Sequence, residues 1–124
     1  MAKILIVDDE QGIRDLLGRL LDKDGYEALF AGSGGTALEL FCEQHPDVIV
    51  LDLKMPGIGG PHGAGQIRRL EPGQRVIVLT GAGTPENEAQ VRALGVADYL
   101  EKDDSLYRVG ESVKQALETA PSSR

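Results

Sequence analysis

Short aliphatic runs recur along the chain and alternate with segments of helical periodicity. Four runs are clear, ILIV at 4–7, EALFA at 27–31, VIVL at 48–51 and VIVL at 76–79, and a weaker one, ADYLE, follows at 97–101. The third and fourth runs are β-branched and lack alternating polar residues, which is typical of strands buried on both faces of a parallel sheet. We therefore expect five strands at these positions.

The first two segments between the runs carry helix start and stop signals. Apolar residues fall at i, i+3, i+4, i+7 and i+8 from Ile13, and Gly25 is placed to end that helix. Ser33 can cap a second helix, which we expect to end near His45 and Pro46.

Three further helices are expected downstream. Glycines crowd 57–65 and each costs up to about 1 kcal/mol inside a helix, so only 65–71 is predicted to be helical there. Thr84, followed by proline and glutamate, begins a fourth helix that Gly95 closes. The last helix carries an apolar stripe over 106–117.

Strand and helix thus alternate five times, which predicts the fold class. The expected fold is α/β, a right-handed, doubly wound, five-stranded parallel sheet whose five helices are distributed over both faces. We expect one domain over residues 1–120 and a flexible tail or the start of a linker at 121–124.

Composition narrows the class of protein. Apolar residues make up 41% and charged residues 27% of the chain, as in globular domains, and no apolar run approaches the about 20 residues needed to cross a bilayer. The N-terminus lacks the pattern of a signal peptide, so we expect a cytoplasmic protein that makes no membrane contact. A net charge of -7 disfavours direct nucleic-acid binding and favours cations or basic protein surfaces as partners.

The single cysteine, Cys42, cannot form an internal disulfide. It lies close to Leu38 and Phe41 in the second helical segment, so we expect it to be a small core residue in a reducing compartment.

Polar residues follow the aliphatic runs at the points where strands should end. Asp8 and Asp9 follow the first run, Asp52 the third, Thr80 the fourth and Lys102 the fifth. Ligands of open α/β sheets bind outside the carboxyl ends of the strands, so these side chains should converge. Three carboxylates there can hold a hard divalent cation, which would offset their repulsion, and Mg²⁺ fits best, with Mn²⁺ as an alternative.

A carboxylate beside such a cation can act as a nucleophile toward phosphorus. Asp52 is the best candidate, because it ends a central run and the sequence Met-Pro-Gly at 55–57 then turns the chain away. The ammonium of Lys102 and the hydroxyl of Thr80 could neutralise the oxygens of the transferred group.

Four motifs in this order resemble the receiver domain of two-component response regulators. They are VDDE at 7–10, LDLKMPG at 51–57, VLTG at 78–81 and ADYLEK at 97–102. The resemblance covers residues 3 to about 118 and implies a flavodoxin-like sheet with strand order 2-1-3-4-5.

The resemblance also implies roles for individual residues. Asp52 matches the phospho-acceptor, and the implied ligands of Mg²⁺ are Asp8, Asp9, Asp52 and the backbone carbonyl of Lys54. The implied switch hydroxyl, phosphate-binding lysine and switch aromatic are Thr80, Lys102 and Tyr99.

The same resemblance implies a signalling protein, not a classical enzyme, that promotes its own Mg²⁺-dependent phosphorylation and dephosphorylation. Its expected partners are a sensor histidine kinase or phosphotransfer protein as donor and a downstream effector protein or output domain. A monomer or weak dimer is expected.

Two features depart from the family pattern. Receivers usually follow the lysine with a cis proline, whereas Asp103 follows Lys102, so we expect a trans bond and a shifted loop. Asp104 is a second acid in this loop, and one of the two can cap the last helix. The second departure is the glycine-rich stretch at 57–65, which is expected to be a loose loop with His62 solvated.

Three alternatives remain from the sequence. One is a degenerate receiver that binds proteins without being phosphorylated. The second is a flavodoxin-like nucleotide or flavin binder, which the acids after the first strand disfavour because they would repel phosphate. The third is a magnesium-dependent phosphatase, disfavoured because no acid stands two residues after Asp52 to protonate a leaving group.

Overall fold

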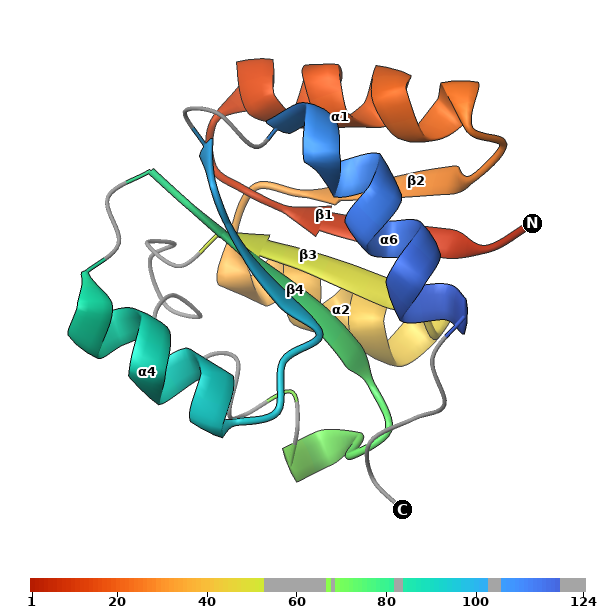
Figure 1. Cartoon of the computed structure of the whole chain (residues 1–124). Helices are drawn as coiled ribbons and strands as arrows, with labels where there is room; N and C mark the ends of the chain where they lie inside the picture. The colour runs from red at the N-terminus through yellow and green to blue at the C-terminus, as the bar shows by residue number, and fades with distance from the viewer. Residues whose placement is uncertain (53–66, 68, 82–83, 103–105, 119–124) are drawn as a thin grey trace.

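The computed structural model describes residues 1–52, 67, 69–81, 84–102 and 106–118. All five expected strands are present and form one parallel sheet in the order β2-β1-β3-β4-β5, which confirms the predicted topology (Figure 1). The strands are β1 Lys3–Val7, β2 Glu27–Ala31, β3 Val48–Asp52, β4 Arg75–Thr80 and β5 Asp98–Glu101.

Four α-helices lie in the described part of the chain, with one short 3-10 turn before the last. They are α1 Gln11–Lys23, α2 Gly34–Gln44, α4 Pro85–Ala93 and α6 Val109–Glu118, and the turn is η1 Leu106–Arg108. The expected third helix falls mostly outside the described residues, which include helical backbone at Ile67, Arg69 and Leu70. The described residues therefore account for four of the five helices expected.

The helices start and stop where the sequence signals lie. The side-chain oxygens of Ser33 and Thr84 each accept a backbone N–H from the first turn, at 3.3 Å and 3.1 Å. Gly25 and Gly95 adopt left-handed backbone, with φ of 87° and 83°, just after α1 and α4. His45 ends α2 in the same region at φ 51°, as expected of a helix-end residue.

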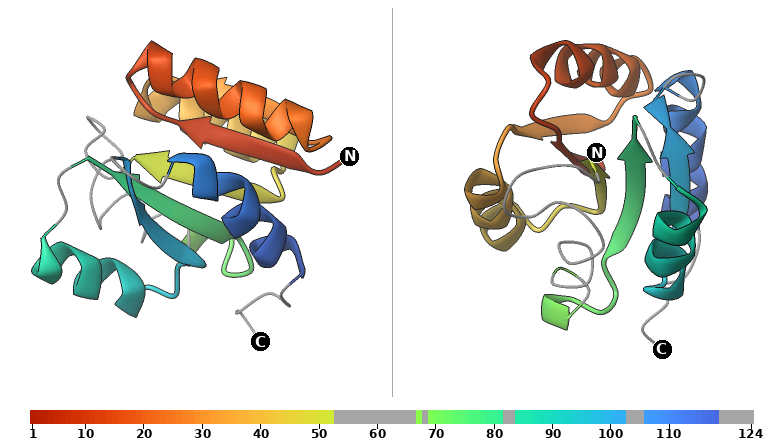
Figure 2. Two further views of the ribbon diagram at one scale, coloured as in Figure 1. Left: turned by 45° about the horizontal axis from the view of Figure 1, so that its top comes forward. Right: turned by 90° about the vertical axis from the view of Figure 1, so that its left-hand side faces the viewer.

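The sheet is covered on both faces (Figures 1 and 2). Alternate residues of each strand point to opposite faces, so each strand contributes side chains to the hydrophobic cores on both sides of the sheet. α1 and α6 pack on one face and α2 and α4 on the other. Figure 2 shows α1 lying along β1 from a second direction. The unbroken apolar runs of β3 and β4 are explained by burial on both sides, since every residue of β3 is buried.

Cys42 contradicts its expected place in the core, because its side chain is exposed. The buried residues of α2 are Gly34, Ala37 and Phe41, which share one side of the helix. Cys42 follows Phe41 and is therefore rotated by about 100° around the helix axis, onto the solvent side.

Several expectations fall outside the described residues: the loop at 57–65 with His62, the carbonyl of Lys54, the bond from Lys102 to Asp103, the capping role of Asp103 or Asp104, and the tail at 121–124. Among the described helices, none combines the length and the apolar character needed to span a membrane.

Candidate functional site

The carboxyl ends of four strands bring the candidate residues to one edge of the sheet. Asp8 directly follows β1, Asp52 and Thr80 are the last residues of β3 and β4, and Lys102 directly follows β5. The parallel register places Asp52 opposite Leu79 and so within one residue of Thr80 along the neighbouring strand. The convergence expected from the sequence is therefore present in the structure.

Three hydrogen bonds fix the position of Asp8. Its backbone N–H donates to the carbonyl of Ala31 at 3.0 Å, which extends the pairing of β1 with β2 by one residue. Its Oδ1 accepts the backbone N–H of Glu10 at 2.9 Å, and its backbone oxygen accepts a hydrogen bond from Arg14 Nη1 at 2.7 Å. The side chain is almost fully buried, and its Oδ2 has no hydrogen-bond partner among the described residues.

The Lys102 ammonium lies among three carboxylates. Its Nζ is 2.8 Å from Glu10 Oε1, 2.9 Å from Asp8 Oδ2 and 3.3 Å from Asp52 Oδ2. The contact with Asp8 is an ion pair without hydrogen-bond geometry, whereas those with Glu10 and Asp52 are hydrogen bonds. One ammonium thus serves as counter-ion to two acids from the β1–α1 connection and one from the end of β3.

Charge and burial act in opposite directions in this cluster. Burial disfavours the charged form of Lys102, but the close contacts with Glu10 and Asp8 and the charges of Asp8 and Asp52 outweigh it and raise the pKa of the ammonium. Burial raises the pKa of Asp8, and the nearby charge of Asp52 adds to this, although the Glu10 N–H and Lys102 oppose it. The Asp8 carboxylate therefore carries a charge that a single ammonium does not fully compensate.

The acids around Asp8 have the character of a site for a hard cation. Asp8, Asp9 and Glu10 each offer a carboxylate oxygen, and these oxygens lie within 4.8 Å of one another. Oxygen ligands of this kind suit Mg²⁺ or Mn²⁺. The buried Oδ2 of Asp8 pairs with the Lys102 ammonium at 2.9 Å, so a positive charge is already accommodated at this atom. The residues present thus fit the group that the sequence predicts.

Glu10 had no predicted role, yet it belongs to both the acid cluster and the Lys102 contacts. The signal was present, because Glu10 directly follows the two aspartates. Its long side chain can turn back over the site from the start of α1, a geometry that the sequence pattern does not reveal.

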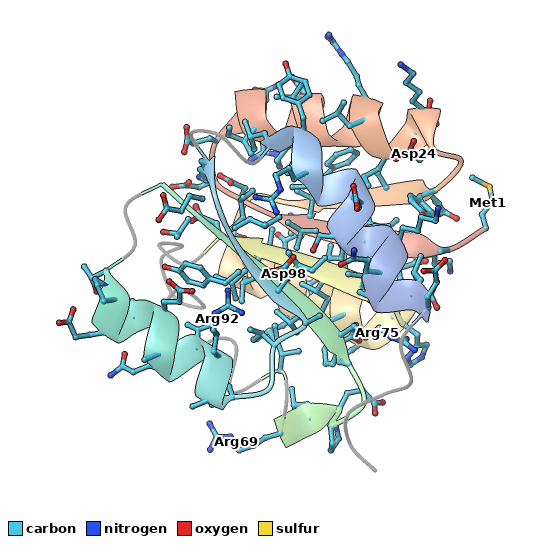
Figure 3. The ribbon with its side chains drawn as sticks, viewed as in Figure 1. Met1, Asp24, Arg69, Arg75, Arg92 and Asp98 are labelled. Atoms are coloured by element: carbon cyan, nitrogen blue, oxygen red, sulfur yellow. The ribbon has the colours of Figure 1, made fainter. Side chains whose placement is uncertain are left out.

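Thr80 and Tyr99 lie on adjacent strands. Thr80 is fully buried at the end of β4, and Tyr99 is nearly so on β5. The Tyr99 ring packs in the core layer under α4, with the Arg92 guanidinium carbon 5.8 Å from its centroid. Figure 3 shows Arg92 projecting from α4 toward β5.

The Tyr99 hydroxyl is buried and has no hydrogen-bond partner among the described residues. Burial raises the pKa of this hydroxyl, the charges of Glu88 and Glu101 add to the effect, and Arg92 opposes it. Tyr99 is therefore a neutral phenol whose hydroxyl donor is unsatisfied within the described part of the chain.

Comparison with known proteins gives a family match over most of the chain. The model of the response regulator receiver domain matches residues 4–114. The sporulation initiation phosphotransferase F of Bacillus subtilis (strain 168) is 33% identical over 115 residues, 93% of this chain and 93% of that protein. The regulatory protein AtoC of Escherichia coli (strain K12) is 34% identical over 94% of this chain, but the match covers 25% of AtoC.

Solved structures agree with the sequence matches. A receiver domain protein from Clostridium thermocellum has a TM-score of 0.88 and 33% identity, with 95% of each chain covered. A CheY-like receiver from Methanospirillum hungatei JF-1 has a TM-score of 0.88 and 28% identity, covering 95% of this chain and 94% of the other. The BeF3-activated DrrB receiver domain has a TM-score of 0.85 and 27% identity, covering 96% of this chain and 99% of the other.

Proposed function

The chain belongs to the response regulator receiver family, and on this premise we propose that it is a Mg²⁺-dependent signalling switch phosphorylated on Asp52. Receivers of two-component systems are signalling modules and act generally as phosphorylation switches. One observation carries the proposal for this chain: the buried Asp52 carboxylate ends a central strand with the Lys102 ammonium 3.3 Å away, at the edge where the acid cluster lies.

In the proposed transfer, an Asp52 carboxylate oxygen forms a bond to phosphorus. The bond from phosphorus to the donor atom breaks at the same time, and the donor atom keeps the electron pair. Lys102, already next to Asp52, neutralises negative charge on the phosphoryl oxygens. Thr80, at the end of the neighbouring strand, supplies a hydroxyl to one of these oxygens.

The proposed metal ligands are Asp8, Asp9, Asp52 and the backbone carbonyl of Lys54. Glu10 lies close enough to Asp8 and Asp9 to add a further carboxylate. Mg²⁺, when bound, supplies positive charge against the phosphoryl oxygens and the three acids. The chain's own part is to hold these carboxylates together on the sheet edge before any cation arrives.

Phosphorylation of Asp52 adds negative charge and acceptor oxygens at the sheet edge. Thr80 is proposed to move toward the phosphoryl group, and Tyr99, with its unsatisfied hydroxyl, to turn into the space vacated. The surface formed by α4, β5 and α6 then changes its affinity for a partner, by about 1 to 3 kcal/mol for couplings of this kind.

The proposed phosphoryl donor is a sensor histidine kinase or a phosphotransfer protein, and the proposed receiver of the signal is an effector protein or output domain. The chain spans nearly all of the Bacillus phosphotransferase and a quarter of AtoC, so both a free-standing receiver over 1–120 and a receiver attached to an output domain accord with the relatives. We propose the cytoplasm as its compartment and a monomer or weak dimer as its state.

Intact-protein mass after incubation with acetyl phosphate and Mg²⁺ tests this function. We expect a gain of one phosphoryl group that EDTA prevents and that D52N loses. D22N is the matched control, since Asp22 is an exposed acid on α1. If the parent chain gains no mass and also binds no beryllofluoride, the degenerate receiver replaces this proposal. The family match leaves no support for the nucleotide binder or the phosphatase.

A further inference from the structure

Arg14 closes the acidic segment that follows β1. It lies in the first turn of α1, and its backbone N–H donates to the carbonyl of Glu10 at 3.1 Å. Its side chain turns back, and Nη1 donates to the carbonyl of Asp8 at 2.7 Å. One residue therefore fixes both ends of the segment from Asp8 to Glu10.

The end of β2 completes this arrangement. The Asp8 N–H is bound by the carbonyl of Ala31, and the next residue, Gly32, lies against the Arg14 guanidinium. A Cβ atom at Gly32 would stand 3.0 Å from Arg14 Nη1 and 3.5 Å from its Cζ. The absence of a side chain at Gly32 thus leaves room for the guanidinium at the position from which it reaches Asp8.

We propose that Arg14 is a positioning residue for the divalent cation, because it holds the Asp8 carbonyl and so keeps the carboxylates of Asp8, Asp9 and Glu10 converged. The inference rests on the metal site of the proposed function. In this role Arg14 touches neither the metal nor the phosphoryl group and acts through the backbone of the acidic segment.

Positioning and charge predict opposite effects of removing Arg14. As a positive charge near the acids, Arg14 repels a second cation, so its charge alone would make Mg²⁺ bind more weakly in the parent chain than in R14Q. As a positioning residue it makes Mg²⁺ bind more tightly in the parent. The sign of the change in affinity therefore separates the two roles.

The test is calorimetric titration of the whole chain with Mg²⁺ at fixed ionic strength. We expect R14Q to bind Mg²⁺ about tenfold more weakly than the parent, as is typical when a group that orients a metal ligand is lost. G32A keeps the Arg14 charge but displaces its guanidinium, so we expect a smaller loss in the same direction. R19Q is the matched control and should bind as the parent does, because Arg19 is an exposed arginine of the same helix.

A second measurement needs no metal and separates positioning from loss of the fold. The Glu10 N–H donates to Asp8 Oδ1, so its amide exchange reports the shape of the segment. We expect faster exchange of this amide in R14Q and unchanged exchange of the amides in β3.

Two outcomes of the titration overturn the inference and remain distinguishable. If R14Q binds Mg²⁺ as tightly as the parent or more tightly, Arg14 has no positioning role, while the proposed function stands. If the parent chain itself binds no Mg²⁺, the metal part of the proposed function fails together with the inference.

Discussion

Glu10 Oε1 lies 2.8 Å from Lys102 Nζ, closer than the Asp52 carboxylate that Lys102 is proposed to assist. The Glu10 side chain is 62% exposed, whereas those of Asp52 and Lys102 are 5% and 12% exposed. An exposed carboxylate thus binds the ammonium that is proposed to neutralise the phosphoryl group. Glu10 and the phosphoryl group would therefore compete for the Lys102 ammonium.

The competition predicts that E10Q binds a phosphoryl mimic more tightly. Because the Glu10 carboxylate is largely exposed to solvent, its ion pair with Lys102 is worth about 1 kcal/mol at most, so we expect beryllofluoride affinity to rise about twofold to fivefold at saturating Mg²⁺. Fluorescence or calorimetric titration measures this, with E39Q as control because Glu39 is an exposed acid on α2. Weaker binding in E10Q under saturating Mg²⁺ would show that Glu10 assists the site.

Mg²⁺ is expected to stabilise the fold. A cation that binds only the folded chain raises the free energy of unfolding by about 2.7 kcal/mol when its concentration is a hundred times its dissociation constant. Thermal unfolding with increasing MgCl₂, at constant ionic strength, should show a rising midpoint that EDTA reverses. D9N should lose most of this rise, and D22N should keep it. A midpoint that does not change with MgCl₂ would argue against a metal site.

The raised pKa of Asp8 predicts how stability depends on pH without metal. Below 3.8, the value for an unperturbed carboxyl, the side chain is neutral in the folded and the unfolded chain. Above its raised folded pKa it is charged in both, and the buried charge lowers the free energy of unfolding. The contribution of Asp8 to stability therefore falls as pH rises between the two values.

D8N removes this charge at every pH. We expect metal-free D8N to be more stable than the parent at neutral pH, with the difference shrinking below 3.8. Urea unfolding at the two pH values measures it. If D8N is less stable than the parent at neutral pH, the ion pair with Lys102 contributes more than the burial of the charge costs.

Tyr99 should titrate as a buried phenol. Its pKa is raised by burial and by neighbouring acids, so its absorbance change on ionisation should occur above pH 10, the usual value for tyrosine. Y99F should remove this component, whereas Y107F should retain it, since Tyr107 is 75% exposed. If the component that Y99F loses titrates at or below pH 10, Tyr99 is accessible to solvent and not a buried phenol.

The bond from Ser112 to Asp98 joins α6 to β5. Ser112 Oγ donates to Asp98 Oδ2 at 2.8 Å, and Asp98 Oδ1 also accepts the N–H of Tyr99. Loss of a hydrogen bond to a charged group costs about 1.5 to 3 kcal/mol, and we expect S112A to lose an amount in this range in chemical unfolding. K114A, an exposed change on the same helix, should lose less than about 0.5 kcal/mol. Equal losses in the two variants would show that this bond adds nothing.

The strands and helix ends were predictable because local chemistry determines them. The buried residues of β3 and β4 are apolar except for Asp52 and Thr80 at the strand ends. Ser33 and Thr84 accept N–H groups of the first turn of their own helices, so they mark helix starts from local sequence alone. The convergence of Asp8, Asp52 and Lys102 was also predictable, because the carboxyl ends of parallel strands share one edge.

Other features depend on angles and reach that a sequence pattern does not contain. Cys42 is one helical step from the buried Phe41, and that step carries it to the surface. Glu10 and Arg14 act over the site through long side chains whose direction is set by the turn into α1. Arg14 donates to a backbone oxygen of Asp8. Every residue carries such an oxygen, so the sequence does not indicate which residue Arg14 contacts.

β3 is hydrogen-bonded to a strand on each side and is covered by helices on both faces, and Asp52 is its last residue. Such a strand is expected to open only when the whole domain unfolds. The proposed phospho-acceptor therefore stays fixed while its surroundings rearrange, and the lifetime of the proposed switch is not limited by local unfolding at Asp52. Motion that carries the signal must arise in the more peripheral residues that reach toward this stationary carboxylate.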